Sequence, residues 1–207
     1  MGDHVGDDPT AVAENRSRIA SSAGLDRAEG WVWLSQVHGT TIHEASTAPS
    51  TSPVADAAIT QTRGLPLAIV TADCAPVVIA CDDTLAVVHA GHRGLGAGII
   101  ERAVDAVRAR GRGPLAAYLG PCIHAKSYEF GEADLAPLVE RFGAAVAAQT
   151  TDGHPALDIP AAVRVALERS GIDAFTDSNV CTATSPNHFS YRRDGTTGRQ
   201  VTVAVLP

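Results

Sequence analysis

Three residues whose side chains bind metals lie at or just beyond the ends of expected strands. They are His38, Cys74 and His89. Because strand ends of a shared sheet bring distant residues together through their loops, we expect the three to converge. Two imidazoles and one thiolate suit zinc and leave a fourth tetrahedral position open for water or substrate. Their separations match no compact metal motif, so ordinary strand-end histidines beside a buried cysteine stay an alternative at this point.

The same residues support a second chemistry that needs no metal. Cys74 would act as a nucleophile activated by His89, with backbone amides at the strand ends as oxyanion donors. One cysteine and one histidine carry little information by themselves. The spacing therefore leaves the metal site and the Cys–His site both open.

Further polar residues gather in segments rich in glycine or arginine. Arg93 lies in a glycine-rich turn before a helix, a geometry that suits an anion, although a tight packing turn is the commoner reading. Arg192 and Arg193 are adjacent and could bind an anionic substrate or simply be solvated. Cys122 and His124 offer a second soft ligand pair, against a structural cysteine beside a surface histidine.

Apolar periodicity, caps and glycines define the elements that position these residues. Helices are expected at 9–22, from 99 to the glycine at 111, at 135–147 and at 159–170. Strands are expected at 31–37, 41–45, 67–71, 76–81, 84–89, 115–119, 179–182, 189–192 and 200–206. Helices and strands mix without strict alternation, which predicts an α/β or α+β fold with mixed sheets.

Composition limits the classes of protein to which the chain can belong. It has 207 residues, 45% of them hydrophobic, and a net charge of −7. We expect a single domain over 1–207, no nucleic-acid partner, no membrane anchor and a cytoplasmic location. Four cysteines without a C-x-x-C pair argue against a disulfide framework or zinc finger.

Five motifs in order along the chain resemble the YfiH family, also called the laccase-domain, polyphenol-oxidoreductase or peptidoglycan-editing-factor family, whose mammalian relative is FAMIN. They are SQVHGT at 35–40, TADC at 71–74, HAGHRG at 89–94, GP at 120–121 with YE at 128–129, and FSYRRDG at 189–195. The resemblance implies a four-layer α/β/β/α sandwich similar to the catalytic domain of cytotoxic necrotizing factor.

The resemblance also implies an activity and its ligands. The zinc ligands of the family fall on His38, Cys74 and His89, which would also be the catalytic residues. Family members are purine nucleoside enzymes that phosphorolyse adenosine, inosine, guanosine and methylthioadenosine and deaminate adenosine. The implied partners are thus a purine nucleoside and phosphate, in a monomer or homodimer. Phosphate is expected first at Arg93, then at Arg192 or Arg193, and we include Gln36 among the substrate-binding residues.

Two departures from the family pattern accompany this resemblance. We expect the chain to lack the usual N-terminal segment of the family, about thirty residues judged by ordinary strand lengths. His92 stands where the family most often has tryptophan, which adds a potential ligand. Two other functions stay open: a copper-dependent, laccase-type polyphenol oxidase, since a His₂Cys set is compatible with copper, and a Cys–His amide hydrolase acting on peptidoglycan precursors.

Overall fold

The computed structural model describes residues 2, 5–25 and 28–207. The α-helices are α1 (Pro9–Ser22), α2 (His92–Gly96), α3 (Ile99–Arg110), α4 (Glu132–Phe142), α5 (Ile159–Arg169) and α6 (Tyr191–Asp194), and the 3₁₀ helices are η1 (Ala28–Gly30), η2 (Ala125–Ser127) and η3 (Ala144–Val146). The strands are β1 (Ile42–Glu44), β2 (Ala57–Thr60), β3 (Leu67–Thr71), β4 (Ala75–Ala80), β5 (Leu85–Ala90), β6 (Ala116–Leu119), β7 (Ala147–Gln149), β8 (Pro155–Leu157), β9 (Ala174–Asp177) and β10 (Gln200–Ala204).

The largest sheet is mixed and carries two of the three expected metal ligands at one end of its central strands. Its order is β1-β2-β5-β4-β6-β9, with β1–β2 and β6–β9 parallel and the central pairs antiparallel. In the β4–β5 pair Ala75 lies opposite Ala90. The residues just outside this pair, Cys74 and Gly91, therefore face one another where the sheet ends. His89 lies inside the same end of β5.

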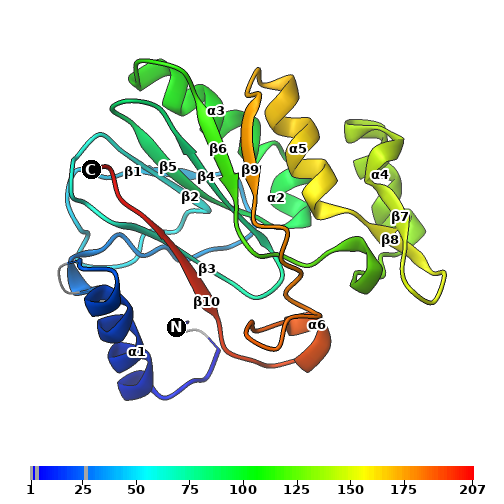
Figure 1. Ribbon diagram of the computed structural model, residues 1–207, viewed down its shortest axis with the longest axis horizontal. Coiled ribbons are helices and arrows are strands. Elements are labelled where there is room, and N and C mark those ends of the chain that lie inside the picture. The colour runs from blue at the N-terminus through cyan, green and yellow to red at the C-terminus, as the bar shows by residue number, and fades with distance from the viewer. Residues whose placement is uncertain (1, 3–4, 26–27) are drawn as a thin grey trace.

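A two-stranded ribbon, β3 with β10, packs on one face of this sheet and gives the fold its four layers. Val88 of β5 belongs to the core shared with α3 and α5, whereas Val87 packs with Ile69 of β3. The next residue of β3, Val70, belongs to a separate cluster of buried apolar residues that also contains Ala20 of α1. This alternation follows from the two-residue period of strands. The α/β/β/α sandwich with mixed sheets is confirmed, and Figure 1 shows the ribbon crossing the larger sheet with α1 beside it.

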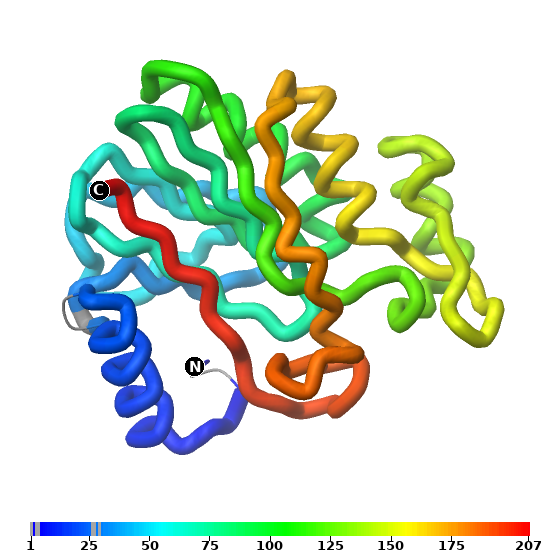
Figure 2. Tube along the Cα trace, viewed as in Figure 1, coloured from blue at the N-terminus to red at the C-terminus, as the bar shows by residue number. Residues whose placement is uncertain are grey.

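The end of the chain returns to the metal-ligand end of the sheet. Figure 2 shows the segment from β9 through α6 to β10 passing the turn between β3 and β4. There the backbone N–H of Arg192 donates to the carboxylate of Asp73 at 2.7 Å. The last fifth of the sequence thus closes over the turn that carries Cys74.

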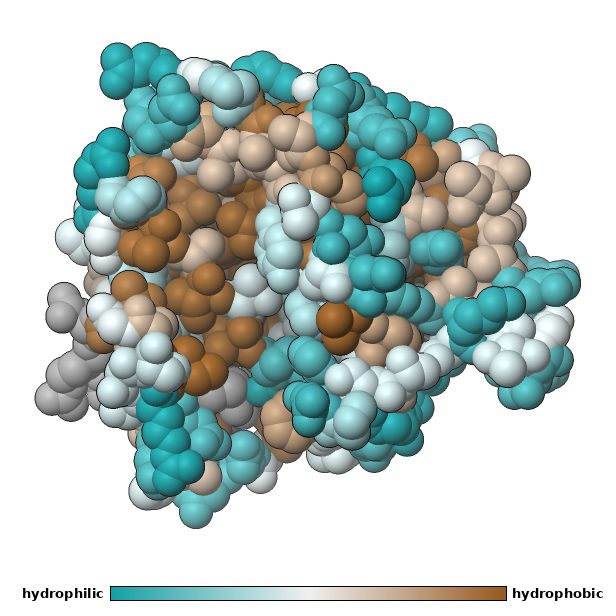
Figure 3. All heavy atoms as spheres, viewed as in Figure 1, coloured by the Kyte–Doolittle hydropathy of each residue, from teal (hydrophilic) through white to brown (hydrophobic). Residues whose placement is uncertain are grey.

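The ribbon covers only part of the larger sheet. Figure 3 shows apolar side chains gathered in a hollow beside β10. Val78 and Ala80 of β4, which pack against the core that contains Ile69 of β3, are only partly buried, and Tyr118 of β6 is 38% exposed. Among the residues placed by the structure, no helix combines the length and apolar character needed to cross a membrane.

Several expected elements are confirmed, and two helices show why. Asp8 and Asp158 each accept a backbone N–H at the start of α1 and α5, and each helix has proline in its first turn. The strand expected at 31–37 is wrong: this segment forms only isolated bridges, at Val32 and Ser35. The side-chain amide of Gln36 bonds both the C=O and the N–H of Val70, so a side chain replaces strand pairing there.

The other errors lie mainly in the second half of the chain. The strand expected at 189–192 is wrong, because the Ser190 side chain caps α6 instead. The segment 179–182 makes one isolated bridge, through Cys181, and strand β9 comes before it. The helix expected at 135–147 begins at Glu132 and stops at Phe142, since Gly143 adopts φ 91°. Strands β2, β7 and β8 are absent from the expectations.

Candidate metal centre and substrate cavity

The three expected metal ligands converge in the structure. Ligand atoms of His38, Cys74 and His89 all lie within 4.8 Å of one another. The rings of His38 and His89 meet edge to face, with centroids 4.7 Å apart. His89 is buried in β5, Cys74 is half-buried before β4, and His38 is exposed in a loop with φ 61°. Residues 51 positions apart in sequence thus form one compact donor set.

Asp56, a residue without a role in the sequence analysis, fixes the orientation of this donor set. Its side chain is fully buried and its Oδ1 lies 2.8 Å from Nδ1 of His89. The same carboxylate accepts the backbone N–H groups of Val37, His38 and Gly39 at distances from 2.6 to 3.3 Å. With Nδ1 of His89 engaged, Nε2 is the ring nitrogen left to bind a metal.

The charges of the donor set favour a thiolate. Burial raises the pKa of Cys74, but the charge of His89 and hydrogen bonds from His38 and His89 outweigh it, and the pKa falls to about 6. Burial lowers the pKa of His89, but Cys74 and Asp56 outweigh it and raise the value to about 9. In the metal-free site these two residues therefore form a thiolate–imidazolium pair at neutral pH. A metal ion would take the place of the imidazolium proton.

The residues fit a metal ion in space as well as in charge. A Cβ atom on Gly91 would lie 2.6 Å from Nδ1 of His38 and 3.2 Å from Sγ of Cys74. Only glycine leaves that space open. Two imidazoles and a thiolate form a three-ligand set with an open fourth position, so the arrangement fits a metal ion and makes this a candidate metal centre.

A cavity of about 390 Å³ opens onto the metal centre. It is lined by Gln36, His38, Val70, Thr71, Ala72, Asp73, Cys74, His89, His92, Tyr128, Tyr191, Arg192 and Arg199. One wall is aromatic: His92 meets Phe130 edge to face at 5.2 Å, and Tyr128 lies 5.4 Å from the same ring. Burial raises the pKa of Tyr128 to about 12, so its hydroxyl remains a donor.

Asp73 connects the metal centre to the C-terminal wall of the cavity. Its carboxylate accepts the hydroxyl of Thr182 at 2.6 Å and the backbone N–H of Arg192 at 2.7 Å. Its own φ is 94°, a conformation that residues other than glycine rarely adopt. The turn next to Cys74 is therefore held in an unfavourable backbone shape by bonds to the segment that closes the cavity.

The residues expected to bind substrate divide into two groups. Gln36 and Arg192 line the cavity, with Arg192 donating to the backbone oxygen of Glu129 at 2.9 Å. Arg93 is exposed on α2 and lies outside the cavity lining. Arg193 donates to backbone oxygens of the 182–188 segment and pairs with Asp194, so it braces a loop.

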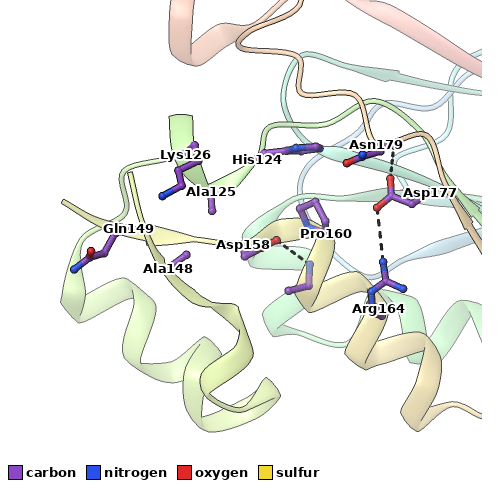
Figure 4. Close-up of a pocket in the computed structure, with 11 residues that line it drawn as sticks. His124, Ala125, Lys126, Ala148, Gln149, Asp158, Pro160, Arg164, Asp177 and Asn179 are labelled. Atoms are coloured by element: carbon purple, nitrogen blue, oxygen red, sulfur yellow. Dashed lines mark hydrogen bonds and ion pairs between the residues drawn. The ribbon is translucent and has the colours of Figure 1, made fainter. Parts of the chain in front are cut away.

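Cys122 and His124 do not join the metal centre. Cys122 is buried and forms a β-bridge with Cys181, and both cysteines are free thiols. His124 lines a second cavity, of about 490 Å³, which Figure 4 shows between η2, β7 and α5. Three of the charged groups in that cavity are engaged within the protein, since Arg164 lies 4.0 Å from Asp177 and Asp158 caps α5, and the metal-ligand donor set does not line it. We therefore place the functional site at the smaller cavity.

Sequence reasoning missed Asp56, Asp73 and Arg199 as parts of the site. A signal for Asp56 does exist, because a carboxylate directly before the apolar residues 57–59 is buried and so needs hydrogen-bond donors. Asp73 precedes a ligand, but its partners are more than a hundred residues away. Arg199 precedes β10 and acquires its position only when that strand pairs with β3.

The chain is similar to known proteins over almost its whole length. The family model described as multi-copper polyphenol oxidoreductase laccase matches residues 1–207. A purine nucleoside phosphorylase of Streptomyces coelicolor is 43% identical over 205 residues, covering 96% of this chain and 84% of the relative. One of Streptomyces griseus is 42% identical over 210 residues, covering 96% and 83%. The crystal structure of the hypothetical protein YfiH of Bacillus licheniformis superposes with a TM-score of 0.91 at 27% identity, covering 100% and 85%.

Proposed function

The chain belongs to the family described as multi-copper polyphenol oxidoreductase laccase, and from that premise we propose that it is a zinc-dependent purine nucleoside phosphorylase. Its substrates would be adenosine, inosine, guanosine or methylthioadenosine, and its products the free base and ribose 1-phosphate, or methylthioribose 1-phosphate from methylthioadenosine. The observation that carries the proposal is the His38–Cys74–His89 donor set opening onto a cavity with aromatic and arginine walls. The names of the relatives supply the reaction class.

In phosphorolysis a phosphate oxygen forms a bond to C1′ of the ribose while the bond from C1′ to the base nitrogen breaks. The base takes the bonding electrons and a proton. In this cavity His92 and Tyr128 line the space available to a planar base, and Arg192 lies over the Tyr128 ring, 4.8 Å from its centroid. Aromatic contacts of this kind hold a purine without fixing its substituents. The Tyr128 hydroxyl, which stays protonated, can donate to the bound nucleoside.

Zinc would act as a Lewis acid and activator of water when bound. The chain's own residues prepare that position: Asp56 fixes the His89 ring, and the shifted pKa of Cys74 keeps the thiolate available. Adenosine deamination, in which water replaces the amino group at C6, is the second reaction we propose for this site. In that reaction water adds at C6 and ammonia leaves; bound zinc would supply the activated water, and no phosphate is needed.

Zinc is preferred to copper because of the ligands near the site. A blue-copper centre has the same His₂Cys set but usually adds a weak axial methionine. The cavity lining contains no methionine among the residues that the structure describes, and the chain's single methionine, Met1, lies outside those residues. Reconstitution separates the metals: we expect turnover with zinc, whereas a strong visible absorption band and phenol oxidation after copper loading would favour the oxidase.

A Cys–His amide hydrolase is the second candidate, favoured by one specific observation. Asp56, His89 and Cys74 are arranged in the order of an acid–base–nucleophile triad, with Asp56 on Nδ1 of His89 and a thiolate beside the ring. A chelator distinguishes the two functions. Metal removal should abolish release of adenine, hypoxanthine or inosine from adenosine, and zinc should restore it; a metal-free protein that cleaves a muropeptide amide would support the hydrolase.

A further inference from the structure

Two arginines line the cavity, Arg192 and Arg199, and within the described residues neither pairs with a carboxylate; Arg199 is the more buried of the two. Arg199 lies directly before β10, is half-buried and lines the cavity. Arg110, Arg112, Arg141 and Arg193 each pair with a carboxylate within 3 Å. Within the described residues Arg199 has no carboxylate at ion-pair distance. A partly desolvated cation with no partner is costly unless a ligand supplies the opposite charge.

The remaining hydrogen bonds of Arg199 orient its guanidinium. Nη1 donates to the backbone oxygens of Thr197 and Gly198, both at 2.9 Å. These two bonds use both Nη1 hydrogens, which leaves Nε and Nη2 without partners in the part of the chain that is placed. The Nε–Nη2 edge is the one that presents two parallel N–H groups to an oxyanion.

The strand pairing places this guanidinium near the metal centre. Gln200, next in sequence, pairs with Thr71 at the end of β3. Arg199 therefore lies across from the start of the turn that carries Asp73 and Cys74, and the charges of both residues act on it. Asp73 already accepts two hydrogen bonds from other residues, and Cys74 belongs to the metal centre. Neither is free to neutralise Arg199.

Arg192, the other arginine in the cavity, is exposed, so its charge is solvated. Its guanidinium bonds the backbone oxygen of Glu129 and covers the Tyr128 ring. Arg192 is therefore part of the aromatic wall. We propose that Arg199 binds the phosphate co-substrate through its Nε–Nη2 edge, beside the metal centre. This inference rests on the proposed phosphorolysis and assigns its anion subsite to Arg199, in place of the exposed Arg93.

The test measures phosphate binding separately from turnover. Inorganic phosphate is titrated calorimetrically into zinc-loaded protein, and the KM for phosphate is measured with inosine, for the wild type and for Arg199→Gln, Arg199→Lys, Arg93→Gln and Arg102→Gln. Arg102 is exposed on α3 and serves as the charge-matched control. We expect Arg199→Gln to raise the Kd and the KM for phosphate about tenfold or more. The KM for inosine should change less than about twofold, because only the anion contact is lost.

Arg199→Lys guards against a purely structural effect, since a lysine retains the positive charge and a long side chain. It should bind phosphate with an affinity between those of the wild type and Arg199→Gln, because an ammonium lacks the bidentate edge. Unchanged phosphate affinity in folded Arg199→Gln would overturn the inference, as would a loss confined to Arg93→Gln. If the wild type binds phosphate through Arg199 but does not cleave nucleosides, only the proposed function fails. A wild type that binds no phosphate overturns the inference.

Discussion

Oδ1 of Asp56 lies 2.8 Å from Nδ1 of His89, and the same oxygen accepts the backbone N–H of His38 at 2.8 Å. One buried carboxylate therefore holds both histidines of the metal centre, one through its ring and the other through its backbone. Such outer contacts fix which ring nitrogen faces the metal. Asp56 therefore orients both histidines without itself being a ligand.

Asp56→Asn should weaken zinc binding by about 10- to 100-fold, the usual cost of losing a carboxylate behind a ligating histidine. Affinity is measured by competition with a chromophoric chelator. Asp83→Asn is the control, because Asp83 pairs with Arg112 and lies outside the cavity lining. Zinc affinity within about twofold of the wild type would show that Asp56 does not support the centre.

Gly91→Ala should prevent metal binding without unfolding the chain. The new Cβ would lie 2.6 Å from Nδ1 of His38, closer than such contacts allow. Gly30→Ala is a matched control, since no atom lies within 4 Å of a Cβ built there. We expect zinc content by atomic absorption to fall from about one per chain to near zero in Gly91→Ala only. Full zinc content in that variant would contradict the assigned geometry.

Zinc binding should release protons in a pH-dependent way. Between pH 6 and 9 the Cys74 thiol is already ionised while His89 is still protonated, so binding releases about one proton. Affinity should thus rise about tenfold per pH unit in this range, level off above pH 9 and fall more steeply below pH 6. Calorimetry in buffers of different ionisation enthalpy counts the protons. Release of no protons at pH 7.5 would contradict the thiolate–imidazolium pair.

Asp73→Asn should loosen the wall formed by the C-terminal segment. The amide retains one oxygen acceptor, whereas the carboxylate accepts bonds from both Thr182 and Arg192. We expect a loss of about 1–3 kcal/mol in the free energy of unfolding, because a buried N–H or O–H group is left unpaired. Urea denaturation measures it, with exposed Asp105→Asn as the control. Equal stability of the two variants would contradict the structural role of Asp73.

The sequence predicts best what depends on nearby residues. Asp8 with Pro9 and Asp158 with Pro160 define the starts of two helices, and both helices are where they are expected. The segment 31–37 alternates like a strand, yet the side chain of Gln36 takes over the pairing with β3, a contact 34 residues away. Local periodicity carries no information about such a partner.

In the candidate site, too, the residues that follow a local sequence pattern are predicted, whereas those that depend on distant contacts are missed. Cys74 and His89 are expected at the ends of buried strands. In the structure Cys74 directly precedes β4, and His89 is the next-to-last residue of β5. The positions of Asp56 and Arg199 depend on pairings between strands that are distant in sequence, β2 with β5 and β3 with β10. No local sequence motif indicates these positions. Arg93 is expected at the site because it lies in a glycine-rich turn. In the structure this turn leads into α2, and Arg93 is exposed and lies outside the cavity lining.

We propose that the protein cleaves purine nucleosides with phosphate in the cavity beside His38, Cys74 and His89. The most direct measurement follows zinc-loaded protein with inosine and phosphate by ³¹P NMR, with hypoxanthine quantified in parallel and Cys74→Ala as the comparison. We expect ribose 1-phosphate and hypoxanthine in equal amounts from the wild type, and neither from the variant. Folded, zinc-loaded protein that forms no ribose 1-phosphate, or that releases hypoxanthine without consuming phosphate, would contradict it.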